Sequence, residues 1–160
     1  MKTSEIDGTI ERAKNAGLWL LADKPVTSTT VAECEQRMGL SFPDGYKHFL
    51  LYYGNAVLPG IEILGLIDRE LDSSSHLNTL RLSSEYHATE NLPRCFVVVR
   101  VLSDGCLACL DLSKTETTQA QVVLWDIYER ADRQVQSPSV LADSFEEYLL
   151  RSIEEARGYS

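Results

Sequence analysis

Cys106 and Cys109 have the C-x-x-C spacing that is typical of zinc ligands. Residues 106–112 are predicted to form a β-strand, on which positions i and i+3 point to opposite faces of the sheet. The other cysteines and the histidines do not supply the second pair of ligands that a structural zinc site needs. The sequence therefore predicts buried structural thiols, with no metal ion and no cofactor.

The three histidines, His48, His76 and His87, fall in three different segments of the chain. A nucleophilic Cys–His site stays open as an alternative, but solvated or helix-capping histidines are the favoured interpretation. The motifs G-x-x-x-x-G-K, G-x-S-x-G and H-E-x-x-H, which bind phosphate, present a nucleophilic serine or hold zinc, do not occur. We therefore predict that the protein is not an enzyme.

Carboxylates are the most frequent ionisable side chains, and they form two groups. The pairs at 33/35, 146/147 and 154/155 have the pattern of solvated helix faces. The second group follows predicted strands, where loops present side chains to a partner, and a metal or acid–base role for these residues is the weaker alternative. The predicted partner-binding residues are the acidic Asp68, Glu70, Asp72, Asp126, Glu129 and Asp132 and the aromatic Tyr52 and Tyr53.

Charge is the most informative property of the composition. The 160 residues include 24 Asp or Glu and 15 Lys or Arg, which gives a formal net charge of −9. Such a protein repels nucleic acid phosphates and anionic membranes, and it attracts basic protein partners. An acidity that serves only solubility is the alternative interpretation.

The sequence shows no sign of membrane targeting. Residues 1–7 lack the apolar segment of a signal peptide, and no apolar run approaches the ~20 residues that span a bilayer. We therefore predict a cytoplasmic protein whose four cysteines stay reduced.

Hydrophobic periodicity predicts the helices that would position these side chains. One helix is predicted to start at Pro43 and to end at Gly54, with a single apolar face made of Tyr46, Phe49, Leu50 and Tyr53. Another helix is predicted to begin near residue 30 with a Thr-x-x-Glu capping box, although residues 28 or 29 could cap it instead, and to end at residue 39. Helices are expected over residues 6–17, 30–39, 43–53 and from 144, and residues 71–87 are left open between helix and loop.

The strands come mainly after these first helices. The β-branched run 96–102 is typical of a central strand, and the turn at 103–105 pairs it with 106–112. Further strands are expected over 61–67 and 121–126, and one short strand before 136. Helices followed by hairpin-linked strands indicate an α+β fold, with a central, mainly antiparallel sheet of about five or six strands flanked by helices, in a single domain over residues 1–160.

The apolar positions of these elements predict one hydrophobic core. Its expected members are Phe49, Leu50, Val98, Val123, Trp125, Phe145 and Leu149.

An ordered set of segments extends over roughly residues 28–152. The set consists of Val31–Glu35, Gly39–Tyr46, Ile61–Ile67, Val97–Ser113, Val122–Asp126 and Asp143–Leu149. Taken together, these segments resemble the SUKH superfamily, which comprises bacterial immunity proteins and yeast cell-wall assembly regulators. The resemblance implies an α+β domain that binds another protein and has no catalytic activity.

The bacterial members of this superfamily look like antidotes of polymorphic toxin and contact-dependent inhibition systems. They bind a secreted toxin, often a nuclease, inside the cell that produces it. An acidic protein suits this role, because a nuclease must be basic where it grips phosphates. The sequence therefore favours an immunity protein that occludes a basic toxin domain, and the alternative is a regulatory interaction module similar to the yeast regulators.

Overall fold

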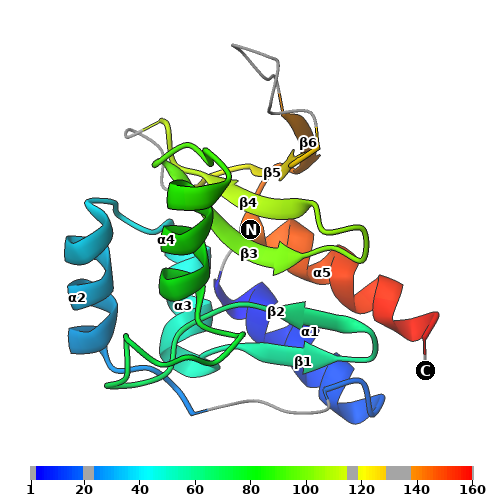
Figure 1. The fold of residues 1–160 in the computed structure, drawn as a ribbon. Helices are drawn as coiled ribbons and strands as arrows, with labels where there is room; N and C mark the ends of the chain where they lie inside the picture. The colour runs from blue at the N-terminus through cyan, green and yellow to red at the C-terminus, as the bar shows by residue number, and fades with distance from the viewer. Residues whose placement is uncertain (1–2, 20–23, 115–118, 129–137, 160) are drawn as a thin grey trace.

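The computed structural model describes residues 3–19, 24–114, 119–128 and 138–159. Figure 1 shows three helices at the start of the chain, then strands around a fourth helix, then a last helix. The helices are α1 (Thr3–Asn15), α2 (Ser28–Met38), α3 (Asp44–Tyr52), α4 (Thr79–Thr89) and α5 (Phe145–Arg157). The strands are β1 (Ala56–Leu58), β2 (Ile61–Ile63), β3 (Phe96–Val101), β4 (Leu107–Asp111), β5 (Val122–Trp125) and β6 (Ser139–Ala142).

The main sheet has the order β3-β4-β5-β6, and all neighbours in it are antiparallel. The predicted α+β class is therefore confirmed. Within the described residues this sheet has four strands where five or six were expected, so the predicted strand number is too high for this part of the chain. The difference arises because β1 and β2 pair only with each other as a short hairpin.

The predicted strand 61–67 ends at Ile63 because the backbone after it turns to other partners. The Leu64 N–H donates to the Val99 carbonyl at 2.8 Å, and Gly65 forms an isolated parallel bridge with Asn78. Helix α4 adds two side-chain contacts to β3: the Val98 N–H donates to the Ser83 hydroxyl, and the Thr79 hydroxyl donates to the Val98 carbonyl. The hydrogen-bonding edge of β3 that faces away from β4 is thus covered by the segment after β2 and by α4.

The apolar side chains of the sheet form two hydrophobic clusters, so the predicted single core is wrong. Successive residues of a strand point to opposite faces, and Val97 and Val99 therefore join a different cluster from Val98. In Figure 1, α4 lies on the near side of β3, and α5 runs behind the sheet. The larger cluster contains the predicted core residues Phe49, Leu50, Phe145 and Leu149, and the smaller one contains Val98, Val123 and Trp125.

Local signals placed most helix ends correctly. Gly39 closes α2 in the left-handed conformation, with φ 68°, and the Ser144 hydroxyl accepts the Glu147 N–H at the start of α5. The predicted cap of α2 was wrong, because Thr27 occupies that position and its hydroxyl accepts the Thr30 N–H. Four consecutive hydroxyl residues, 27–30, are candidates for this role, and a long-range contact described below selects Thr27.

Candidate interaction surface

Asp68, the first residue of the predicted acidic cluster, holds the start of α2 in place. Its Oδ1 accepts the Thr27 N–H at 2.9 Å, the Thr27 hydroxyl at 2.9 Å and the Thr30 hydroxyl at 3.0 Å. These hydrogen bonds, the Thr27 backbone N–H first, keep the pKa of Asp68 below its ordinary value. The geometry therefore gives this carboxylate a structural contact, and its role in partner binding stays a prediction.

Replacement of Asp68 by alanine should lower the urea midpoint at pH 7 and have a smaller effect below about pH 3. The folded-state pKa of Asp68 is depressed, so its stabilising contribution is complete above the unfolded value of about 3.9 and is lost as the pH falls further. Urea unfolding curves at both pH values test this. The exposed neighbour Glu70, as Glu70→Ala, is the control, and equal losses of midpoint at both pH values would contradict the assignment.

The other two residues of this predicted cluster lie on an exposed surface beside α2. Arg37 binds Asp72 at 2.9 Å and Glu33 at 3.2 Å, while Glu70 is exposed between Arg69 and Leu71. A hollow of about 540 Å³ lies among these side chains. We name this region the α2 carboxylate surface, which consists of Glu33, Glu70 and Asp72 together with Arg37 and Arg69. Three carboxylates against two guanidinium groups leave it only moderately acidic.

The second predicted acidic cluster follows β5, and only Asp126 of it can be placed. The Asp126 carboxylate accepts the Tyr128 N–H at 2.9 Å and the Cys106 thiol at 3.5 Å, so it shapes the turn after the strand. Glu129 and Asp132 lie outside the described residues. Their contribution to partner binding stays a prediction.

The two predicted tyrosine anchors differ in their surroundings. Tyr52 is 60% exposed on α3, with its ring 4.4 Å from that of His48. Tyr53 turns inward, and its hydroxyl donates to the Asp7 carboxylate at 2.5 Å, where His48 Nε2 also binds at 2.9 Å. The hydrogen bond from Tyr53 is the main cause of the lowered pKa of Asp7, and burial raises the pKa of Tyr53. Tyr53 thus links α3 to α1, whereas Tyr52 is the one of the two that a partner could reach.

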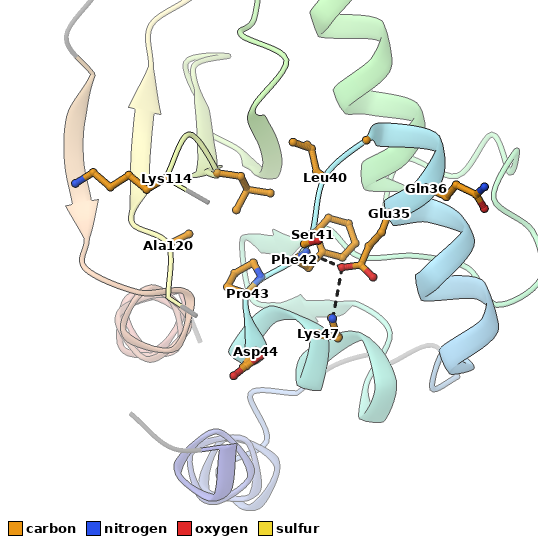
Figure 2. Close-up of a pocket in the computed structure, with 12 residues that line it drawn as sticks. Glu35, Gln36, Leu40, Ser41, Phe42, Pro43, Asp44, Lys47, Lys114 and Ala120 are labelled. Carbon is orange, nitrogen blue, oxygen red and sulfur yellow. Dashed lines mark hydrogen bonds and ion pairs between the residues drawn. The ribbon is translucent and has the colours of Figure 1, made fainter. Parts of the chain in front are cut away.

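A groove that the sequence did not predict lies where α2 turns into α3. Figure 2 shows Glu35 at its centre, where the carboxylate accepts the Phe42 N–H at 2.7 Å and pairs with Lys47 at 3.5 Å. The groove has a volume of about 620 Å³ and continues past Leu112 and Lys114. Glu35 was expected on a solvated helix face, but the reversal of the chain after Gly39 brings Phe42 back against it. The groove offers surface to a partner, but its central charged side chains, Glu35 and Lys47, already pair with each other.

Glu146 was also expected to be solvated, and it is 5% exposed. Its carboxylate occupies the space next to Gly45 in the first turn of α3: a Cβ at position 45 would lie 1.8 Å from Glu146 Oε1. Burial is the main cause of its raised pKa, and the charges of Asp44 and Glu5 act in the same direction. Helical spacing alone could not reveal this burial, because it depends on a glycine 101 positions earlier in the chain.

The sulfur and imidazole groups are dispersed. Cys109 is buried in the smaller cluster, while Cys106 faces Asp126, and burial raises the pKa of Cys106 to about 11. His76 pairs with Glu62, and His87 bonds the Phe96 carbonyl. Within the residues that the structure describes, no three His, Cys, Asp or Glu side chains group closely enough to hold a metal ion.

Across the described helices, none is both long and apolar enough to cross a bilayer.

Comparison with known families gives a match over most of the chain. The family model SUKH_5, described as SMI1-KNR4 cell-wall, matches residues 6–154. Among curated proteins, the uncharacterized protein YnaB of Bacillus subtilis (strain 168) is 29% identical over 82 residues, which are 51% of this chain and 47% of YnaB. This chain therefore matches about half the length of that relative.

The fold also occurs in a solved structure. The crystal structure of a protein from Pseudomonas syringae pv. tomato aligns with a TM-score of 0.58 at 17% sequence identity. The alignment covers 76% of this chain and 83% of that chain. An identity this low shows a shared fold and nothing about a shared partner.

Proposed function

The chain belongs to the SMI1-KNR4 cell-wall family of SUKH proteins, and from this membership we propose that it is an immunity protein that binds and neutralises a cognate secreted toxin. The toxin is a basic nuclease, and inhibition works by covering its surface. The protein acts in the cytoplasm of the producing cell, where the toxin would otherwise reach its substrate. No catalysis by this chain is needed.

The observation that carries the nuclease part of the proposal is the net charge of −9. A nuclease needs Lys and Arg side chains where it contacts phosphates, and a complementary acidic surface accelerates the encounter with such a protein. The acidic protein itself is repelled by nucleic acid, so it can compete for the toxin without binding the toxin's substrate.

The α2 carboxylate surface is the part of the described structure that we assign to the toxin contact. Glu70 and Asp72 are exposed, and Asp72 is held beside Arg37. Because the segment that carries both residues is fixed to α2 through Asp68, little conformational freedom would be lost when a partner binds. The predicted contacts of Tyr52 would add an aromatic side chain on α3.

Charge reversal of this surface should abolish protection. The double variant Glu70→Lys/Asp72→Lys is expected to slow association with the toxin by roughly tenfold or more, and to slow it less at high ionic strength, where screening already weakens the attraction. Stopped-flow association kinetics with the co-purified toxin domain, and growth of toxin-exposed cells, measure the two effects. Thermal stability should change little, because exposed ion pairs contribute little to folding.

A matched control separates this surface from the total charge. Glu11 on α1 and Glu154 on α5 are exposed and also lie in helical ion pairs, so Glu11→Lys/Glu154→Lys makes the same change in net charge at another place. If both double variants lose protection equally, the loss is caused by the overall charge and not by the α2 carboxylate surface. Full protection by the Glu70→Lys/Asp72→Lys variant would remove the α2 carboxylate surface from the proposal.

A regulatory role without a toxin is the second candidate, and the description of the matching family model as cell-wall favours it. The two roles predict different effects on the growth of the producing cell. An immunity protein rescues cells only from its cognate toxin, whereas a regulator changes the growth of the producing strain when its gene is deleted in the absence of any toxin. Deletion of the gene that encodes this chain, in cells that meet no toxin, distinguishes the two roles.

A further inference from the structure

A second exposed surface lies at the end of the molecule that is opposite to α2. Figure 1 shows the β3–β4 turn, the β1–β2 turn and the last turn of α5 at this end. Among the described residues, five large apolar side chains are exposed, and three of them lie here: Val101 is 40% exposed, Tyr128 71% and Tyr159 61%. We name the group of Val101, Asp104, Tyr128 and Tyr159 the hairpin-end surface.

Both tyrosine rings are oriented by contacts with the backbone. The Tyr128 hydroxyl donates to the Asp104 carbonyl at 2.8 Å, and the Tyr128 N–H donates to Asp126. The Tyr159 ring lies over the β1–β2 turn, so close that a Cβ at Gly60 would be 3.0 Å from the ring. Exposed rings that are already held in one orientation lose little side-chain entropy when a partner covers them.

A hollow of about 310 Å³ opens beside the Tyr159 ring, and its lining also includes Val101, Asp104, Arg100 and Glu155. Tyr128 does not line the hollow, but its hydroxyl is bonded to the Asp104 carbonyl next to it. The Arg100 side chain is only 9% exposed, and its guanidinium is paired with both carboxylate oxygens of Glu155 at 3.2 and 3.0 Å. The positive charge of Arg100 is therefore neutralised by Glu155. The exposed Asp104 carboxylate makes the opening of the hollow negative.

We propose that the hairpin-end surface docks a segment of a partner protein that presents a Lys or Arg side chain next to an aliphatic residue. The cation lies against a tyrosine face and pairs with Asp104, and the aliphatic residue packs on Val101. This surface is separate from the α2 carboxylate surface, so the inference does not depend on the proposed function. A second copy of this chain is a poor occupant, because each copy carries a net charge of −9 and brings the same carboxylates.

The experiment is a selection of random peptides, displayed on phage, against the immobilised full chain. Enriched sequences should contain Lys or Arg beside an aliphatic residue. Synthetic peptides of these sequences should bind Tyr128→Ala and Tyr159→Ala roughly tenfold or more weakly than the unchanged chain, as measured by isothermal titration calorimetry. Asp104→Asn should also weaken binding, because it removes the charge but keeps the Oδ1 acceptor for the Cys106 N–H.

Val140→Ala is the matched control, since Val140 is also an exposed apolar side chain but lies on β6. Peptides that are as sensitive to Val140→Ala as to Tyr128→Ala would overturn the inference, as would acidic enriched sequences or a selection without enrichment. A dimer in light scattering that Tyr128→Ala dissociates would overturn it in favour of a second copy. None of these measurements uses a toxin, so the peptide-binding result can be interpreted even if the protein is not an immunity protein.

Discussion

Replacement of Gly65 by alanine is expected to lower the free energy of unfolding by about 3 kcal/mol, with a fall in melting temperature of about 6–12 °C. A Cβ at this position would lie 1.6 Å from the Gly54 carbonyl oxygen, which accepts the Leu66 N–H at 3.1 Å. Because the obstacle is backbone, no side-chain rotation can relieve it. The bridge of Gly65 with Asn78 must shift as well, and differential scanning calorimetry will measure the loss.

Gly8→Ala is the control for this substitution. Gly8 lies within α1, and a Cβ there would meet only the end of Arg12 at 3.8 Å. Alanine favours the helix over glycine by about 0.5–1 kcal/mol, so this variant should be slightly more stable than the unchanged chain. If Gly65→Ala melts at the temperature of Gly8→Ala, the close approach of the two backbone segments is wrong.

Trp125→Ala is expected to destabilise the protein by about 3–5 kcal/mol, which is the usual cost of truncating a buried aromatic side chain. Trp125 is 7% exposed and packs edge-on against Phe96, with ring centroids 5.9 Å apart. Its indole N–H has no hydrogen-bond partner among the described residues, so the loss comes from packing. Trp125→Phe removes that buried N–H and less volume, and it should cost much less in urea unfolding.

The division of the apolar side chains into two clusters predicts which pairs of substitutions interact. Phe49 and Phe145 have ring centroids 5.2 Å apart within the larger cluster, so Phe49→Leu and Phe145→Leu should be clearly non-additive. Trp125 belongs to the other cluster, so Trp125→Phe combined with Phe145→Leu should be additive within about 0.5 kcal/mol. Coupling of the same size in both pairs would indicate one continuous core instead.

The sequence was sufficient for elements whose signals are local. The stripe of Tyr46, Phe49 and Leu50 predicted α3, and the β-branched run with its turn predicted the β3–β4 hairpin. These patterns depend on residues within one or two turns of each other. They also determined the α+β class, because short turns between consecutive strands leave few other topologies.

The sequence was not sufficient where a residue's environment depends on a distant segment. Asp68 binds Thr27, 41 positions earlier, and this contact both fixed the start of α2 and removed Asp68 from the freely exposed carboxylates. Tyr53 binds Asp7, 46 positions earlier, and so differs from its neighbour Tyr52. Only the tertiary fold could distinguish the buried members of the candidate site from the accessible ones.

The closure of β3 has a consequence for the behaviour of the protein at high concentration. Its run of Val97, Val98 and Val99 is the type of segment that pairs with other chains and nucleates aggregates when the edge of a sheet is open. Here Leu64, Thr79 and Ser83 occupy hydrogen-bonding positions on its outer side. This β-branched strand is therefore not offered to neighbouring copies, and its pairing with them should stay rare even in a concentrated solution.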